Sequence, residues 1–258
     1  KAIDAGIDQF GGEKDTEIVI ELLKKNLISV SRIDDSVRRI LKNKFSLGLF
    51  DNPYVEVDLV KDRVNTDRNI KLGREAQKKS MVLLKNDSIL PLKKNLNIFL
   101  DGFKTKDLSY GNVVNNIESA DVIVSYLHTV FNGNQPSGID RLVDNVLSTI
   151  FPNQDLNFNP EIINKLDSFA KEKPTIVIVD LNRPAILNRI NEMSSGLLAT
   201  FGVDEEVIFE ILFGYHAPNG KLPFEIPSSM NEVRNQFEDV PDDTKNPTFR
   251  AGFGLTYK

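Results

Sequence analysis

The sequence predicts an α/β fold built on a mostly parallel, doubly wound sheet. Four short apolar runs each have the length of one buried strand, and segments with helical periodicity separate them. Strands that alternate with helices pair in parallel and carry helices on both faces of the sheet. The four runs occupy residues 97–101, 121–126, 175–181 and 197–201.

The connecting segments predict the helices of this sheet. Asn159 precedes Pro160, a pair typical of a helix start, and Asp204 precedes two glutamates and an apolar stripe. We therefore expect helices over residues 67–80, 113–119, 160–172 and 184–192, and a further one after Asp204 that Gly214 ends. Residues 81–84 and 222–226 are expected to form two more short strands.

The first 50 residues have a different pattern, which predicts two amphipathic helices. Asp15 is a candidate cap for the first helix, and Ser31 with Asp34 forms a capping-box pattern for the second. Two helices alone make a poor core, so we expect them to pack on something absent from this chain or back onto the rest of it. Residues 51–65, with Pro53, few apolar side chains and alternating charges, are expected to form a linker.

Composition excludes several classes of function. The chain has 258 residues, 40% of them hydrophobic, a net charge of −5, two histidines and no cysteine. Disulfides, cysteine nucleophiles and zinc sites of recognisable spacing are excluded, and we expect no metal and no cofactor. Without a basic cluster we expect no nucleic-acid partner, and without an apolar run of about 18 residues we expect no membrane span.

The compartment stays open, because a cysteine-free chain suits periplasmic, secreted and cytoplasmic proteins equally. The first residue already stands inside a sequence pattern, so we expect the natural N-terminus to lie upstream, together with any signal peptide.

Candidate binding residues cluster after the predicted strands, because ligands of open α/β sheets bind at the carboxyl ends of the strands. The segment 128–158 is far longer than an ordinary connection, and long loops in compact domains are often functional. Its Asn and Gly content suits hydrogen bonds to hydroxyl groups and suits plain turns equally well. Arg183 stands at the end of the clearest predicted strand, 175–181. Its guanidinium could bind a sugar hydroxyl, lie at a domain interface or form an ion pair. The candidates that the long segment holds are His128, Asn132, Asp140, Arg141, Asp144 and Asp155.

Four motifs give the chain a family resemblance. The string LFGYHAPNGKLPFEIP (212–227) is similar to the C-terminal signature of family 3 glycoside hydrolases, in which a helix ends in FG and a turn leads into GKLP. Three further stretches resemble the same family in the same order: RIDDSVRRILKNKFSLGLFDNPY (32–54), REAQKKSMVLLKNDSILPL (74–92) and AGFGLTY (251–257). The resemblance covers most of the chain.

The resemblance implies a domain organisation. In this family a (β/α)8-type barrel precedes the α/β sandwich domain. Residues 1–50 are then the end of a truncated barrel, 51–65 a linker and 66–258 the sandwich domain. AIDAGIDQF (2–10) resembles the AGxD stretch near the end of that barrel, and the resemblance implies a structural role for Asp8.

The resemblance also implies a function. The chain is expected to be the C-terminal portion of a retaining, exo-acting β-glycosidase, similar to β-glucosidases, which hydrolyses terminal β-linked sugars. Such enzymes use two carboxylates, and in this family the nucleophile is an Asp on the barrel, upstream of Lys1. We therefore expect a carbohydrate substrate, the upstream barrel as the partner within the same protein, and no activity from this chain alone.

The acid/base residue departs from the family pattern. Many family members carry a Glu in a GEGxDR-like pattern, whereas this chain has PSGIDR (136–141), with Ser137 in the place of the Glu. Serine cannot protonate a leaving oxygen at neutral pH. Asp140 is the first candidate to replace the Glu and Asp155 the second. His128, Asn132, Arg141 and Arg183 are the candidates for substrate binding.

Two other hypotheses remain. A family 3 β-N-acetylglucosaminidase would carry an acid/base His on the barrel, so the missing Glu would matter less. A non-catalytic module that supports a barrel or binds sugar is the alternative of another class. A flavodoxin-like nucleotide binder is disfavoured, because the glycine spacing of a phosphate loop is absent from the sequence.

Overall fold

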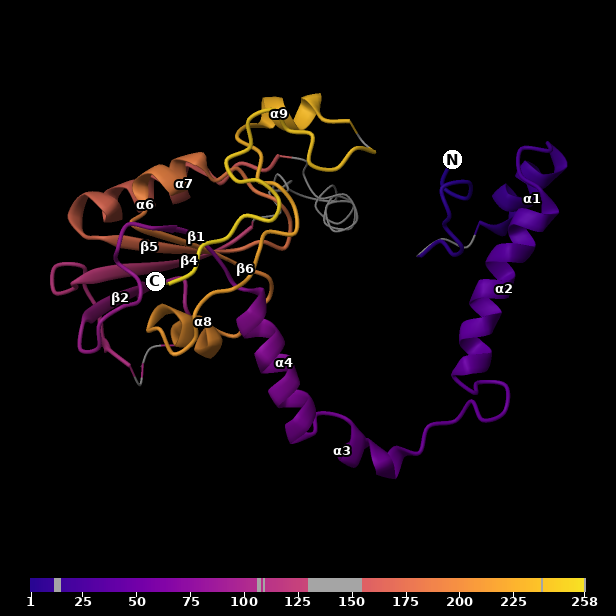
Figure 1. Ribbon diagram of the computed structural model, residues 1–258, viewed down its shortest axis with the longest axis horizontal. Helices are drawn as coiled ribbons and strands as arrows, with labels where there is room; N and C mark the ends of the chain where they lie inside the picture. The colour runs from indigo at the N-terminus through magenta and orange to yellow at the C-terminus, as the bar shows by residue number, and fades with distance from the viewer. Residues whose placement is uncertain (12–14, 106–107, 109, 130–154, 238, 258) are drawn as a thin grey trace, which may run out of the picture. The chain divides into compact units, whose positions relative to one another are not determined.

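The computed structural model describes residues 1–11, 15–105, 108, 110–129, 155–237 and 239–257. The chain divides into two compact units, Lys1–Thr66 and Asp67–Lys258. Figure 1 labels the helices and strands of both units.

The first unit is helical, as the sequence predicts. It contains α1 (Thr16–Lys24), α2 (Val30–Ser46), the 3-10 turn η1 (Val57–Leu59) and α3 (Val60–Arg63). The last two lie in the segment predicted as a linker, which is therefore partly helical.

The cap of α2 differs from the predicted one. The Ser29 hydroxyl accepts a hydrogen bond from the Arg32 amide at 3.2 Å, so the helix begins at Val30 and the Ser31 capping box is wrong. Two serines stand two positions apart, and the helix uses the earlier one. Asp15 stands at the N-cap of α1, but its side chain makes no capping hydrogen bond.

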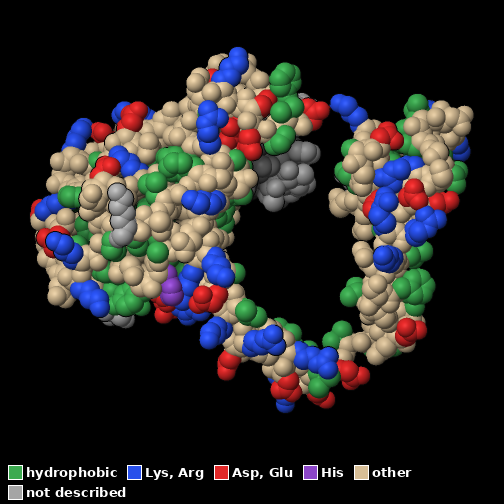
Figure 2. All heavy atoms as spheres, in the orientation of Figure 1, with side chains coloured by type: hydrophobic (Ala, Val, Ile, Leu, Met, Phe, Trp, Pro, Cys, Tyr) green, Lys and Arg blue, Asp and Glu red, His purple; other side chains and the backbone are tan. Residues whose placement is uncertain are grey.

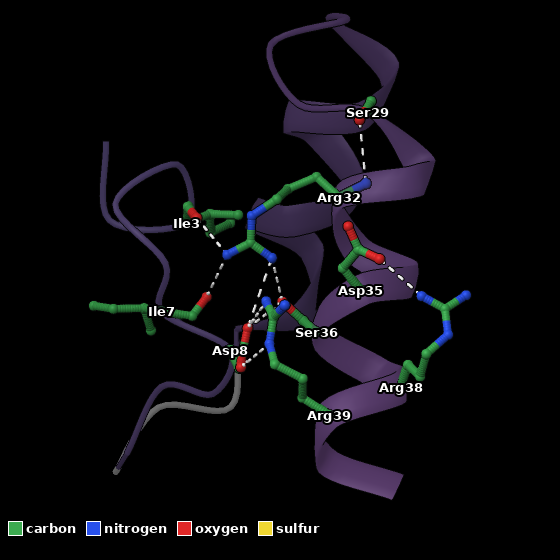
Figure 3. Close-up of polar contacts among 9 residues, drawn as sticks. All are labelled: Ile3, Ile7, Asp8, Ser29, Arg32, Asp35, Ser36, Arg38 and Arg39. Carbon is green, nitrogen blue, oxygen red and sulfur yellow. Dashed lines mark hydrogen bonds and ion pairs between the residues drawn. The ribbon is translucent and has the colours of Figure 1, made fainter. Parts of the chain in front are cut away.

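Asp8 fastens the N-terminal loop to α2 (Figure 3). Its carboxylate accepts two hydrogen bonds from Arg39, at 2.6 and 2.7 Å, and one from the Ser36 hydroxyl at 2.8 Å. Arg32 reaches the same loop by donating to the carbonyl of Ile3 at 2.6 Å. The contacts of Asp8 are those of a structural residue.

Acid should loosen this loop. The Arg39 hydrogen bonds, followed by the Ser36 one, hold the pKa of Asp8 well below its usual range. Because this pKa is lower in the folded chain than in the unfolded one, the ionised carboxylate stabilises the folded form at pH values above the ordinary aspartate pKa. This stabilisation is lost as the pH falls from that value through the lowered pKa. We expect the amides of residues 5–7 to lose protection from hydrogen exchange below about pH 4, after correction for intrinsic exchange rates.

Two arginine variants separate this effect from general acid unfolding. Arg39→Gln should remove most of the pH dependence of protection in residues 5–7. Arg38→Gln is the matched control, because Arg38 pairs with the exposed Asp35 at 2.7 Å on the same helix. Equal pH profiles in the Arg39 variant and the unchanged chain would contradict the assignment.

The second unit contains a six-stranded sheet in the order β1-β6-β5-β4-β2-β3. Adjacent strands pair in parallel except β1, which pairs antiparallel with β6. The strands are β1 (Val82–Asn86), β2 (Asn97–Asp101), β3 (Asn112–Val114), β4 (Val122–His128), β5 (Thr175–Asp180) and β6 (Gly196–Thr200). The predicted α/β class, the mostly parallel sheet and its four principal strands are confirmed.

Two predicted elements are wrong. Residues 113–119 are not a helix: β3 occupies Asn112–Val114 and pairs in parallel with β2. A three-residue strand with adjacent valines is too short to show a period of its own. Residues 222–226 do not form a strand but make an isolated bridge, in which Ile226 pairs with Phe249. Pro223 and Pro227 flank this bridge and have no amide proton to extend a ladder.

Helices cover both faces of the sheet (Figure 1). On one face, α6 (Pro160–Glu172) and α7 (Asn188–Met193) bury Leu166, Phe169 and Ile190 against β4, β5 and β6. On the other face, α8 (Glu205–Leu212) buries its apolar side chains against the same strands.

Two further helices belong to this unit. The helix α4 (Asp67–Ser80) packs on α8, and a short helix, α9 (Met230–Asn235), comes after α8 in the chain. Asn159 caps α6 by accepting from the Glu161 amide, as predicted. The helix predicted over 184–192 is shorter and begins at Asn188.

The two C-terminal motifs lie along the edge strand β1. The Gly220 amide donates to the Met81 carbonyl at 3.1 Å, and the Leu255 amide donates to the Leu83 carbonyl at 2.8 Å. The Tyr257 hydroxyl donates to the Ile211 carbonyl at the end of α8, at 2.6 Å, and burial raises the pKa of this hydroxyl. The motifs therefore cover β1, an edge that would otherwise expose backbone groups to other chains.

The surface carries mixed charge. On the face shown in Figure 2, Lys and Arg side chains are interspersed with Asp and Glu side chains. Within the described ranges, no helix has the length and the hydropathy of a membrane span.

Candidate functional site

Three polar side chains form a row at the carboxyl edge of the sheet. His128 at the end of β4 is in register with Asp180 at the end of β5, and Asp180 is in register with Thr200 at the end of β6. In-register neighbours of parallel strands share one face of the sheet. Ile178, two positions before Asp180, packs in the core cluster that contains α8, so the row lies on the α8 face.

The Asp180 carboxylate is the centre of this row. It is 5% exposed and has four hydrogen-bond partners. Its Oδ1 accepts from the Gly202 amide at 2.8 Å and from the Thr200 hydroxyl at 3.2 Å. Its Oδ2 faces Nδ1 of His128 at 3.3 Å and accepts from Asn182 Nδ2 at 3.3 Å. These partners satisfy the lone pairs of a buried carboxylate, which would otherwise be costly to bury.

The sequence prediction missed Asp180. Its signal is the acidic residue that ends the apolar run TIVIVD, at the edge where such sheets bind ligands. Its hydrogen-bond donors come from three separate parts of the chain, and the sequence does not reveal that they converge.

His128 stands above a stack of aromatic rings. Its ring centroid is 4.6 Å from that of Tyr126, and Phe103 continues the stack at 5.3 Å from Tyr126. Burial raises the pKa of Tyr126. The His128 side chain itself is 59% exposed. It is therefore held by β4 and the stack on one side and open to solvent on the other.

The loop after β2 is fixed against the start of α8. The Glu205 carboxylate accepts from the Lys104 and Thr105 amides at 2.9 Å and from the Thr105 hydroxyl at 2.6 Å. Burial alone would raise the pKa of Glu205, but these hydrogen bonds outweigh it and lower the pKa. A Cβ on Gly102 would meet the Tyr126 carbonyl oxygen, so only glycine fits at this turn. Because Phe103 belongs to this loop, the stack beneath His128 is fixed as well.

Arg183 contacts Asp155 through the backbone carbonyl of Asp155 and not through its carboxylate. Arg183 Nη2 donates to the backbone carbonyl of Asp155 at 2.7 Å. The Asp155 carboxylate accepts from the amide and the side chain of Asn157, at 2.9 and 2.8 Å, which forms a local turn. The loops after β4 and β5 are further tied because Thr129 donates twice to the Asp180 carbonyl.

The structure thus places half of the predicted site residues. His128, Asp155 and Arg183 are described: His128 is the last residue of β4, and Asp155 and Arg183 lie in the segments that follow β4 and β5. Asn132, Asp140 and Arg141 lie outside the described residues, as does Ser137. Among the described residues, acidic and histidine side chains form no group of three or more that suits a metal ion. The site offers hydroxyl, imidazole, guanidinium and carboxylate groups, which suit hydrogen bonds to a polyhydroxylated ligand.

Comparisons with known proteins agree with this chemistry. The family model described as the glycosyl hydrolase family 3 C-terminal domain matches residues 109–257. A probable beta-glucosidase C of Aspergillus oryzae is 38% identical over 263 residues, which cover all of this chain and 40% of that protein. A periplasmic beta-glucosidase/beta-xylosidase of Dickeya chrysanthemi is 36% identical over all of this chain and 39% of its own length.

Solved structures share the fold. The beta-glucosidase from Listeria innocua in complex with glucose superposes with a TM-score of 0.64 at 20% identity, over 99% of this chain and 43% of that one. A beta-glucosidase involved in saponin metabolism from intestinal bacteria gives a TM-score of 0.65 at 20% identity, over 99% of this chain and 47% of that one. This chain therefore spans less than half the length of the proteins that it matches.

Proposed function

This chain belongs to glycosyl hydrolase family 3, whose C-terminal domain it contains, and on that premise we propose that the whole protein is a retaining, exo-acting β-glycosidase. It hydrolyses terminal β-linked sugars in the manner of a β-glucosidase. The observation that carries the proposal is the 38% identity, over the entire chain, to a probable beta-glucosidase. The polar row around Asp180 supports it, because sugars are bound through their hydroxyl groups.

The proposal divides the catalytic work between this chain and an upstream part. Residues 1–50 belong to the end of a barrel, 51–65 connect, and 66–258 form the domain that contributes one wall of the sugar site. The Asp nucleophile lies upstream, on the barrel. Taken by itself, the first unit leaves Ile18, Val37, Leu41 and Phe45 each more than a third exposed, which is the kind of apolar surface that such a barrel would cover.

Within this chain, Asp140 is the first candidate for the proton-transfer residue and Asp155 is the second. His128, Asn132, Arg141 and Arg183 are candidates for hydrogen bonds to sugar hydroxyls. Arg183 has support from its place in the segment that follows β5, where its guanidinium donates to the backbone carbonyl of Asp155.

A panel of aryl glycosides tests the proposal in the full-length protein. We expect release of nitrophenol from the β-glucoside or the β-xyloside and none from the α-glucoside, with the β-anomer of the free sugar as the first product in proton NMR. Turnover of the β-N-acetylglucosaminide alone would replace the proposal with the acetylglucosaminidase alternative. No turnover of any β-glycoside, together with binding of glucose or cello-oligosaccharides in calorimetry, would indicate a non-catalytic module.

A further inference from the structure

The buried carboxylate of Asp180 contacts the exposed imidazole of His128, and the packing of the core does not require this polar pair. We propose that Asp180 fixes His128 in the tautomer with its proton on Nδ1, and that the outward Nε2 accepts a hydrogen bond from a hydroxyl of the sugar. Asp180 is then a positioning residue and His128 a binding residue. The binding step rests on the proposed function, whereas the tautomer follows from this chain alone.

The tautomer follows from the hydrogen-bond inventory of Asp180. An ionised carboxylate only accepts hydrogen bonds, and its other three partners here are donors: the Thr200 hydroxyl, the Gly202 amide and Asn182 Nδ2. Nδ1 of His128, at 3.3 Å from Oδ2, must therefore carry a proton to pair with it. A neutral imidazole has one such proton, so Nε2 keeps its lone pair.

The position of the imidazole is fixed as firmly as its tautomer. Asp180 is bound to the amide of Gly202 after β6, and its backbone carbonyl accepts from Thr129 after β4, so three neighbouring strand ends hold the carboxylate in place. The Tyr126 ring supports one side of the imidazole, with 4.6 Å between the ring centroids. A preorganised acceptor of this kind loses little conformational entropy when it binds a ligand.

The two side chains differ in exposure, and this difference supports a positioning role for Asp180 and a binding role for His128. Asp180, with its side chain 7% exposed and its lone pairs occupied, has little capacity for a ligand. His128, 59% exposed at the carboxyl edge of the sheet, has one ring nitrogen committed and one available. A lone pair on a neutral ring suits a hydroxyl donor, which is the group that a neutral sugar offers in greatest number.

NMR of the 258-residue chain with 15N-labelled histidine tests the tautomer. The sequence has only His128 and His216, and His216→Gln assigns the two sets of signals. At about pH 8.5, where imidazoles are neutral, we expect the His128 proton on Nδ1. In Asp180→Asn, the amide can donate to Nδ1, and the proton should move to Nε2. A proton on Nε2 of His128 in the unchanged chain would overturn the proposal without any variant.

Kinetics of the full-length protein test the binding role. His128→Phe keeps the ring over Tyr126 but removes the acceptor, so we expect KM for the β-glucoside to rise about tenfold, the value of one hydrogen bond. His128→Gln, which retains an acceptor oxygen, should recover part of this loss. Asp180→Asn should raise KM to a similar extent, and the double variant no further, because the two residues act as one unit.

The control is His216→Gln, which should leave KM unchanged, because His216 pairs with Glu210 beside α8 and is absent from the row. An unchanged KM in His128→Phe would overturn the binding role. If the unchanged full-length protein hydrolyses no β-glycoside, the proposed function fails, and the NMR result alone then decides whether Asp180 positions His128.

Discussion

Replacing Asp140 by Asn in the full-length protein should slow the hydrolysis of cellobiose by about 10²- to 10⁴-fold, the usual contribution of a general acid. The same variant should lose far less rate on an activated aryl β-glucoside, because a good leaving group needs no protonation in the transition state. Azide should restore part of the rate on the aryl substrate, since it attacks the glycosyl-enzyme without help from a base. The measurement is kcat/KM for both substrates, with and without azide.

Asp155→Asn is the matched comparison. The structure shows the Asp155 carboxylate accepting from Asn157, and an asparagine side chain keeps the oxygen that this turn needs. The variant should therefore fold normally and isolate the loss of the ionisable group. If Asp155→Asn alone shows the leaving-group dependence, Asp155 is the acid. If both variants keep wild-type rates on cellobiose, the proton comes from another residue.

Gly220→Ala should be strongly destabilising. A Cβ at this position would lie 2.5 Å from the Met81 carbonyl oxygen and 2.7 Å from that of Ser80, and these are backbone atoms that cannot rotate away. Overpacking of this kind costs about 1–3 kcal/mol in the free energy of unfolding. We expect a lower urea midpoint, followed through the exchange protection of the β1 amides.

Gly73→Ala is the control for Gly220→Ala. Gly73 lies in α4 with open space around the position of a Cβ, and alanine should stabilise the helix by about 0.5–1 kcal/mol. Opposite shifts of the two midpoints would support the account of the GKLP motif as a backbone contact with β1. Equal shifts would contradict it.

The sequence predicts the centre of this fold better than its margins. The runs that became β5 and β6 are apolar at nearly every position because both faces of these strands are covered, and a continuous run of that kind is visible in one sequence. β3 has three residues and lies at the edge of the sheet, where it pairs with β2. Residues 222–226 make their backbone hydrogen bonds with residues 248–253. Their conformation depends on partners that no local pattern specifies.

The candidate site shows the same limit. His128 and Arg183 are predictable because each follows a recognisable strand at the edge where ligands bind. Asp180 falls within the predicted strand 175–181, and its importance depends on Gly202 and His128, which lie 22 and 52 residues away in the chain. Convergence of this kind is a property of the sheet order, which one sequence does not give.

The most direct test of the central claim compares the 258-residue chain with the full-length protein on nitrophenyl β-glucoside, under identical conditions. The claim is that this chain contributes one wall of a glycosidase site whose nucleophile lies upstream. It predicts turnover by the full-length protein and none by the chain alone, because an acid/base residue cannot perform a double displacement without the second carboxylate. Turnover by the purified chain at ordinary enzyme rates would contradict it.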